Sequence, residues 1–324
     1  MKIGILGAGS IADVVTATLV QMEELECYAV ASRSLEKAEA FAKKFGISQA
    51  YGSYEEMLSD PQVDLVYVAT PHSHHHAHML MALEYGKHVI CEKAFTMNAD
   101  QARKVREFAS QKGLYVAEAI WTRYMPSRQM IADILASGVI GSVNTLTANL
   151  SYNVAFKERL MTPELAGGAL LDIGIYGLNF ALMQFGDDIE RIESTVRLTD
   201  TGVDGMETIT IFYHDGRMAV LTHSIFCRGD RKGIIHGDKG YLIVENINNP
   251  QSVAVYDVND NLIARHEVPE QINGYEYEFA EAVRCIREGK TESDSMPMAD
   301  TIKVMRVMDA LRKQWGFVYP QEKE

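Results

Sequence analysis

The sequence contains few cysteines, and none of them lies in a C-x-x-C pair. Scattered single cysteines in a chain of 324 residues exclude the dense disulfide scaffold of small secreted domains and give no zinc-finger spacing. They favour reduced, mostly buried thiols over a disulfide or zinc framework. The four positions are Cys27, Cys91, Cys227 and Cys285.

The sequence also lacks an excess of positive charge. It has 31 Lys and Arg residues against 44 Asp and Glu residues, which gives a formal net charge of −13. An acidic surface repels a phosphate backbone, so we expect no nucleic-acid partner. A local basic patch could still bind one phosphorylated cofactor.

Long apolar runs and a secretory signal are missing as well. The longest apolar run, Ala169–Phe185, is interrupted by Asp172, Asn179 and Gln184 and is short for a membrane span. The opening MKIGILGAG reads as a strand rather than as a charged segment followed by an apolar one. We therefore expect no membrane partner and a cytoplasmic location.

Strand and helix signals alternate in the first third of the chain. Nearly continuous apolar strands, such as VDLVYVA at 63–69, alternate with segments of helical pattern. Such strands indicate a parallel sheet covered on both faces. The expected strands are 2–6, 25–31, 63–69, 87–91 and 114–117, and the main expected helices are 10–22, 35–45, 73–85 and 98–113.

After residue 119 the expected strands follow one another with short turns, which indicates an antiparallel sheet. The length suggests two domains. We predict an α/β protein with a dinucleotide-binding domain at 1–120. A second α/β domain at 121–324 would contain a large, mainly antiparallel open sheet. Its expected strands are 143–152, 193–198, 206–213, 217–226, 232–236, 241–244, 252–258 and 262–268, with helices at 126–137, 275–288 and 299–314.

The first strand runs into a G-x-G-x-x-A motif. Gly7 permits a tight turn, Gly9 lets a pyrophosphate approach the backbone, and Ala12 permits close packing of helix on sheet. The helix that begins at Ser10 and Ile11 offers its N–H groups and positive dipole end to phosphates. In this strand–turn–helix context the motif favours dinucleotide binding over a structural turn.

Ser32 and Arg33 follow the second strand, where an NAD site usually has an Asp or Glu. Without that acid, a guanidinium can bind the 2′-phosphate of NADP. We therefore predict NADP, with NAD as the alternative. The competing interpretation is a solvated arginine at a helix start.

Five histidines follow the strand at 63–69, within ATPHSHHHAH at 69–78. His74 and His78 have a spacing that zinc can use, but no H-E-x-x-H pattern is present. Because ligands bind at the carboxyl ends of strands in such sheets, a lining of the cofactor pocket is favoured over a metal site or a solvated helix face. Glu92 and Lys93 end the next strand at the same edge, where Lys93 could donate a proton or polarise a carbonyl.

The combined motifs resemble the glucose–fructose oxidoreductase / inositol dehydrogenase (Gfo/Idh/MocA) family. They are the glycine turn, the T-P-x-x-x-H segment at 70–75, Cys91-Glu92-Lys93 and GGALLDIGIY at 167–176. AYGSYEEM at 50–57 and AEAIWTRYMP at 117–126 resemble the subgroup of dimeric dihydrodiol and NADP-dependent D-xylose dehydrogenases. The family usually has proline where this chain has Ala94, and we expect this change to alter the stiffness of the loop.

The resemblance implies a homodimer through the second sheet, with Lys93 and Tyr176 as an acid/base pair supported by Asp172. It implies hydride transfer between a nicotinamide and a secondary alcohol of a sugar, polyol or cyclic trans-diol. A non-catalytic NADP-sensing regulator on the same fold is the alternative function. The expected cofactor-binding residues are Gly7, Gly9, Ser10, Ile11, Ala12, Ser32, Arg33, Thr70, Pro71, His72, His75, Glu92, Lys93, Trp121 and Arg123, and no metal ligand is expected.

Overall fold

The computed structural model describes residues 1–323 and divides into two compact units. The first unit comprises Met1–Tyr124 and Gln271–Met305, and the second comprises Met125–Glu270 and the described residues from Arg306 onward. Each unit contains its own sheet.

A six-stranded parallel sheet forms the centre of the first unit, in the order β3-β2-β1-β4-β5-β6. The central strands are buried along their length because helices cover both faces, which explains their unbroken apolar sequences. This is the doubly wound order, with its switch point between β1 and β4. The strands are β1 Lys2–Leu6, β2 Glu26–Ala31, β3 Gln49–Tyr51, β4 Leu65–Val68, β5 His88–Glu92 and β6 Val116–Ala119.

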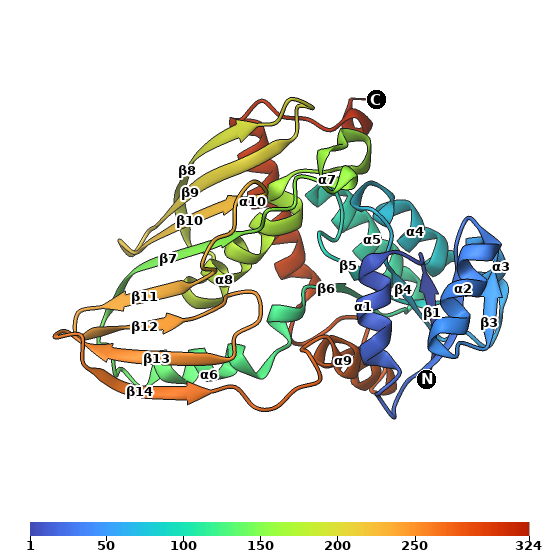
Figure 1. The fold of residues 1–324 in the computed structure, drawn as a ribbon, viewed down its shortest axis with the longest axis horizontal. Coiled ribbons are helices and arrows are strands. Elements are labelled where there is room, and N and C mark those ends of the chain that lie inside the picture. Colours follow the sequence, from blue (N-terminus) through green and yellow to red (C-terminus); the bar gives the residue numbers. More distant parts are fainter. Residues whose placement is uncertain (324) are drawn as a thin grey trace. The chain divides into compact units, whose positions relative to one another are not determined.

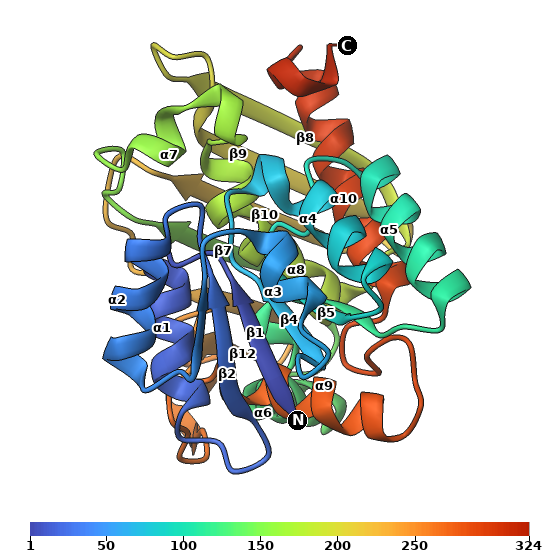
Figure 2. The ribbon, with the colours of Figure 1, turned by 90° about the vertical axis from the view of Figure 1, so that its right-hand side faces the viewer.

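Helices of the first unit begin where the sequence provides side-chain caps. Ser34, Ser53 and Asn98 each accept a hydrogen bond from the backbone N–H three residues on. Figure 2 shows α1 and α2 on one face of the sheet and α4 and α5 on the other. The helices are α1 Ser10–Leu19, α2 Leu35–Phe45, α3 Tyr54–Ser59, α4 His72–Glu84, α5 Ala99–Lys112 and α9 Glu276–Arg287, with a 3-10 turn at Trp121–Arg123.

The division of the chain differs from the predicted boundary at 120/121. α9 belongs to the first unit, whereas the prediction assigned everything after residue 120 to the second domain. Phe279, Val283 and Cys285 of α9 pack into the same apolar core as Ile3, Val15 and other residues of the first strands and helix. The chain returns to the first unit at Gln271, after the whole sheet of the second unit, and no local sequence signal marks this return.

The second unit is built on an eight-stranded sheet in the order β14-β13-β12-β11-β7-β10-β9-β8 (Figure 1). Only the β7–β10 pair is parallel among the described strand pairs. The strands are β7 Val143–Ser151, β8 Ile189–Leu198, β9 Asp204–Tyr213, β10 Met218–Ser224, β11 Gly233–Gly237, β12 Gly240–Val244, β13 Ser252–Asp257 and β14 Leu262–Glu267. The helices are α6 Pro126–Ala136, α7 Glu158–Met161 and α8 Ile175–Phe185, with a π-helix at Leu170–Gly174 and 3-10 turns at Pro163–Leu165 and Pro320–Glu322. The division between the units falls within α10 Met298–Gln314, whose residues 298–305 belong to the first unit and 306–314 to the second.

The two faces of this sheet differ in burial. In β9, Glu207, Ile209 and Ile211 are buried, whereas the alternate residues Thr208 and Thr210 are exposed or half-buried. Side chains alternate along a strand, so one face is packed and the other is open to solvent. The predicted homodimer would use the open face, and it stays a prediction.

One helical stretch, Pro163–Phe185, is long and apolar enough to cross a membrane by length and composition. However, 83% of its most apolar window is buried inside the structure, as in the core helix of a soluble protein. The stretch is therefore weak evidence for a membrane span.

Candidate cofactor and catalytic site

The turn after β1 has the geometry that its glycines predict. Gly7 has a φ of +106°, and its N–H donates to the carbonyl of Ala31 at 3.0 Å. A Cβ at Gly7 would come within 3.0 Å of the Ala69 carbonyl oxygen, whereas a Cβ at Gly9 would meet nothing closer than 4.0 Å. Gly9 caps α1, so the first N–H groups of this helix border a space that a phosphate can enter.

The end of β2 supplies a polar and cationic corner. Ser32 is buried and Arg33 is exposed, and the charge of Arg33 acts on His74, His78 and Tyr54. The Tyr54 and His78 rings lie 4.9 Å apart, edge to face. Burial, followed by the neighbouring histidines and Arg33, lowers the pKa of His78 to about 4. Tyr54 lies in the YEEM start of α3 and could not be recognised from the sequence as a neighbour of this site.

His75 connects the two loops that follow β4 and β5. Its ring is completely buried, with Nδ1 2.8 Å from the carbonyl oxygen of Ala94 and Nε2 2.7 Å from that of Thr70. Burial is the main cause that lowers the pKa of His75 to about 4. Because a neutral imidazole has one N–H, the ring donates to one of these carbonyl oxygens and packs against the other, between the loop containing Thr70 and Pro71 and the loop containing Lys93.

Glu92 and Lys93 differ in their placement at the carboxyl end of β5. Glu92 is 5% exposed and accepts a hydrogen bond from the Tyr67 hydroxyl at 2.5 Å, so its carboxylate lies inside the unit. We expected this carboxylate to project toward the cofactor, and the structure differs because Tyr67 binds it in the core. Lys93 is half-buried, and the peptide bond between Lys93 and Ala94 is cis.

Glu118 on β6 is a buried carboxyl beside this loop. Its Oε1 accepts a hydrogen bond from the backbone N–H of Phe95 at 3.0 Å. Burial raises the pKa of Glu118 to about 7, although the Phe95 N–H and the charges of Arg123 and Lys93 act in the opposite direction. Glu118 could not be selected from the sequence, because VAEA at 116–119 has the pattern of an ordinary strand.

Glu118→Gln is expected to stabilise the protein more at pH 8 than at pH 5. Because the folded protein binds the Glu118 proton more tightly than the unfolded chain, wild-type stability falls as the pH rises from about 4.5 to about 7. Glutamine cannot ionise, so the variant should gain up to about 3 kcal/mol of relative stability above pH 7. Urea unfolding at both pH values measures this difference. The control is Glu107→Gln at an exposed position, and an equal effect of Glu118→Gln at both pH values would contradict the assignment.

Trp121 and Arg123 are fixed by residues far along the chain. The Trp121 ring stacks on Tyr275 with centroids 4.2 Å apart and planes 16° apart. Arg123 is 5% exposed and forms an ion pair with Asp300 at 3.5 Å. Both partners lie in the returning part of the first unit, so the local sequence around Trp121 and Arg123 contains no signal for them.

In the second unit, Asp172 and Tyr176 lie on consecutive helical segments. Asp172 is in the π-helix and Tyr176 is in the first turn of α8, where it is 8% exposed. A guanidinium nitrogen of Arg159 lies 3.0 Å from a carboxylate oxygen of Asp172. The predicted helix after Gly168 is present, but the π-helix and the partner Arg159 were not anticipated. A π-helical turn is rare and is frequently found at functional sites.

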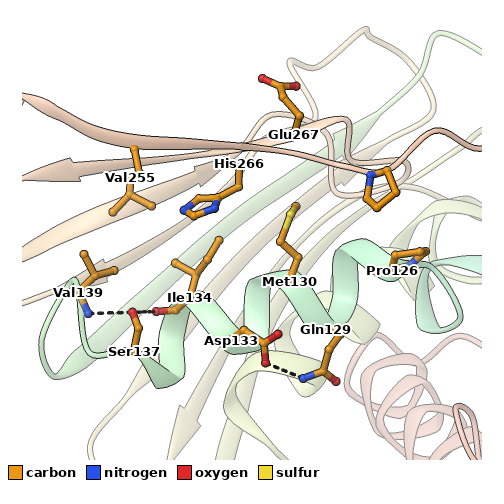
Figure 3. A pocket seen from close by; sticks show the side chains of 12 residues that line it. Pro126, Gln129, Met130, Asp133, Ile134, Ser137, Val139, Val255, His266 and Glu267 are labelled. Carbon is orange, nitrogen blue, oxygen red and sulfur yellow. Dashed lines mark hydrogen bonds between the residues drawn. The ribbon is translucent and has the colours of Figure 1, made fainter.

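A groove in the second unit lies between α6 and the β13–β14 hairpin (Figure 3). Its volume is about 740 Å³, and Met130, Ile134 and Val255 give it a largely apolar lining. His266 points toward the helix, whereas Glu267 points away from it. None of the predicted cofactor or catalytic residues lines this groove, so we assign it no part in the chemistry.

The strand order and the glycine turn at the switch point define a dinucleotide-binding architecture. Residues 1–119 match the model of an oxidoreductase family with an NAD-binding Rossmann fold, and residues 129–243 match the GFO/IDH/MocA C-terminal domain. The chain belongs to the GFO/IDH/MocA family of NAD(P)-binding oxidoreductases. The predicted family and fold class are therefore confirmed.

Curated relatives align along the whole chain. The chain is 34% identical over 336 residues to the trans-1,2-dihydrobenzene-1,2-diol dehydrogenase of Mus musculus. The alignment covers 100% of this chain and 99% of the relative. The Homo sapiens dehydrogenase of the same name is 33% identical over 331 residues, with the same coverage.

Solved structures show the same architecture. KijD10, a 3-ketoreductase from Actinomadura kijaniata in complex with NADP and TDP-benzene, superposes with a TM-score of 0.90 at 25% identity over 97% of each chain. An aldose-aldose oxidoreductase from Caulobacter crescentus complexed with glycerol gives a TM-score of 0.88 at 22% identity over 98% of each chain. The latter similarity concerns the fold alone.

Proposed function

We propose that this protein transfers hydride between NADP and a secondary alcohol of a sugar, polyol or cyclic trans-diol. The observation that carries the proposal is the position of Lys93. It directly follows β5 at the carboxyl edge of the sheet that also contains the Gly7–Gly9 turn. Ligands of doubly wound sheets bind at this edge. The diol dehydrogenases and the NADP-bound ketoreductase that resemble the chain support the substrate class and the cofactor.

Side chains of the protein would accept the proton that the substrate hydroxyl loses in this reaction. Tyr176 would take the hydroxyl proton as the carbinol C–H bond breaks and the C–O bond becomes a carbonyl. A nicotinamide cofactor held by the first unit would supply the hydride acceptor. The ammonium group of Lys93 would favour the phenolate form that can accept the proton. Asp172, already paired with Arg159, would orient Lys93 or a substrate hydroxyl.

The remaining cofactor residues would fix the dinucleotide in place. The α1 start at Ser10, with Ile11 and Ala12 behind it, would face the pyrophosphate. Thr70 and Pro71 lie in the loop that leads into α4, which His75 ties to the Lys93 loop. Trp121, which is stacked on Tyr275, and the buried Arg123 would border the nicotinamide end.

The test is a panel of aldoses, inositols and trans-dihydrodiols, followed by NADPH absorbance. We expect reduction of NADP with at least one class and slower reduction of NAD. A non-catalytic sensor would bind NADP without turning over any member of the panel. That result, obtained with protein that binds NADPH normally, would reject the enzymatic function.

A further inference from the structure

Three ionisable side chains lie completely buried beside the helical segment that contains Asp172 and Tyr176. Asp204 and Glu207 belong to β9, and His223 belongs to β10. Glu207 and His223 are direct cross-strand partners, so both point to the packed face of the sheet. A packed face is normally apolar, and three ionisable groups on it require an explanation.

The glycines of the helical segment lie directly against these side chains, with no room for a Cβ atom. A Cβ at Gly177 would lie 2.1 Å from Nε2 of His223, and a Cβ at Gly174 would lie 2.6 Å from Oε1 of Glu207. Since real Cβ atoms do not approach so closely, a larger residue at either position would force Glu207 or His223 to move. These two glycines flank Tyr176 in the sequence.

The start of the segment is fixed in the same way. Oδ2 of Asp204 accepts a hydrogen bond from the backbone N–H of Leu170, the first residue of the π-helix. Gly168 has a φ of +113°, and a Cβ there would lie 2.2 Å from Oδ1 of Asp204. Asp204 therefore caps the segment, while Glu207 and His223 contact its middle.

Burial of the Glu207–His223 pair costs folding free energy that an apolar pair at the same positions would not cost. Nδ1 of His223 lies 3.2 Å from Oε1 of Glu207, and neither side chain has another hydrogen-bond partner among the described residues. Burial raises the pKa of Glu207 well above its usual range and lowers that of His223 to about 3, so it disfavours the charged form of each group. Buried polar groups with so few partners are destabilising. Their presence is therefore better explained by the shape and orientation that they impose on the adjacent helix.

We propose that Glu207 and His223 are positioning residues, which seat the helix at Gly174 and Gly177 and thereby fix the orientation of Tyr176. The inference rests on the proposed role of Tyr176 in proton transfer. Neither residue belongs to the family motifs that point to the site, and neither touches a reacting atom. Their effect on catalysis would pass through the backbone of the two glycines.

The test is a double-variant cycle of Gly177→Ala, His223→Ala and the two combined. Alanine normally favours a helix over glycine, so any loss in Gly177→Ala comes from the collision with the imidazole. We expect each single variant to lower kcat by about 10-fold to 100-fold, because misplacement of a reacting group by about 1 Å has this effect. The combined variant should recover kcat at least about 5-fold over Gly177→Ala, because the added methyl group then fills the vacated space.

Two further measurements separate positioning from general damage. The dissociation constant of NADPH should stay within about twofold of wild type, since the cofactor residues belong to the other unit. His223→Gln, which keeps a polar group of similar length, should retain more kcat than His223→Ala. His236→Ala on the open face of the same sheet is the matched control and should leave kcat unchanged.

The outcomes separate this inference from the proposed function. A combined variant no better than Gly177→Ala, or single variants with wild-type kcat, would overturn the positioning role. If the wild type turns over no substrate, the proposed function fails, and the melting temperatures of the same four proteins still test the contact. If the losses in melting temperature of the two single variants simply add in the combined variant, the proposed contact between Gly177 and His223 is overturned. A combined variant that is more stable than Gly177→Ala would support this contact.

Discussion

Lys93→Met and Tyr176→Phe are each expected to lower kcat by about 100-fold or more, with little change in NADPH binding. Methionine keeps much of the length of lysine but has no charge, and phenylalanine keeps the ring of tyrosine without its hydroxyl. Each substitution thus removes one group of the proposed proton path and little else. Steady-state rates with the best substrate of the panel, and NADPH fluorescence titrations, measure the two quantities.

The surroundings of each residue make this comparison interpretable. Lys93 is half-buried and follows Glu92, which ends β5 and is bound by Tyr67 in the core, so the strand should persist without the ammonium group. Tyr176 is 8% exposed within α8, and its ring remains in the phenylalanine variant. The NADPH titration detects any wider disturbance of the first unit.

Matched substitutions elsewhere provide the controls. Lys112→Met removes an exposed lysine at the end of α5, and Tyr256→Phe removes a hydroxyl from β13. Both controls should keep wild-type kcat. Wild-type turnover in Lys93→Met or Tyr176→Phe would remove that residue from the mechanism, and a parallel loss of NADPH affinity would indicate a binding role instead.

The sequence was sufficient for the local features of the first unit. Apolar periodicity is a short-range signal, and the helices that it predicted are present, with side-chain caps at Ser34, Ser53 and Asn98. The turn at Gly7 and Gly9 is likewise local. Side chains at the carboxyl ends of parallel strands could be grouped because the topology of such sheets is restricted.

Long-range partners could not be predicted from the sequence. Tyr275 and Asp300 contact Trp121 and Arg123 from a part of the chain that returns to the first unit after residue 270. A single sequence has no signal for such pairings. The burial of Glu92 depends on Tyr67, which occupies a neighbouring strand and could have pointed to either face.

The π-helix was also beyond the sequence analysis. Periodicity predicted one regular helix after Gly168, because the apolar pattern of GGALLDIGIY does not distinguish an α-helical turn from a π-helical one. The structure associates the change with tertiary contacts, since Asp204, Glu207 and His223 all meet this segment. Local propensity is readily overridden where buried groups of another element determine the backbone.

Arg33→Ala is expected to raise the dissociation constant of NADP by about 10-fold to 100-fold and to leave that of NAD within about twofold. A charge-assisted hydrogen bond to the 2′-phosphate contributes about 1.5–3 kcal/mol, and only NADP carries this phosphate. Arg33 is exposed beside the buried Ser32, at the end of β2 where the ribose of a bound dinucleotide would lie. Its charge also acts on His74 and His78, which places these rings around the same corner.

The design distinguishes a specific clamp from a general electrostatic effect. Lys37→Ala removes an exposed cation from the first turn of α2, one turn beyond Arg33, and should change the affinity for NADP far less. Arg33→Lys keeps the charge but loses the planar pair of donors, so its affinity should fall between those of wild type and Arg33→Ala. Because His78 is uncharged down to a pH of about 4, the discrimination between NADP and NAD should depend on Arg33 rather than on histidine protonation between pH 6 and pH 8. Equal losses in the Arg33 and Lys37 variants, or unchanged NADP affinity in Arg33→Ala, would show that Arg33 is a solvated side chain and would reject the assignment of NADP preference to this corner.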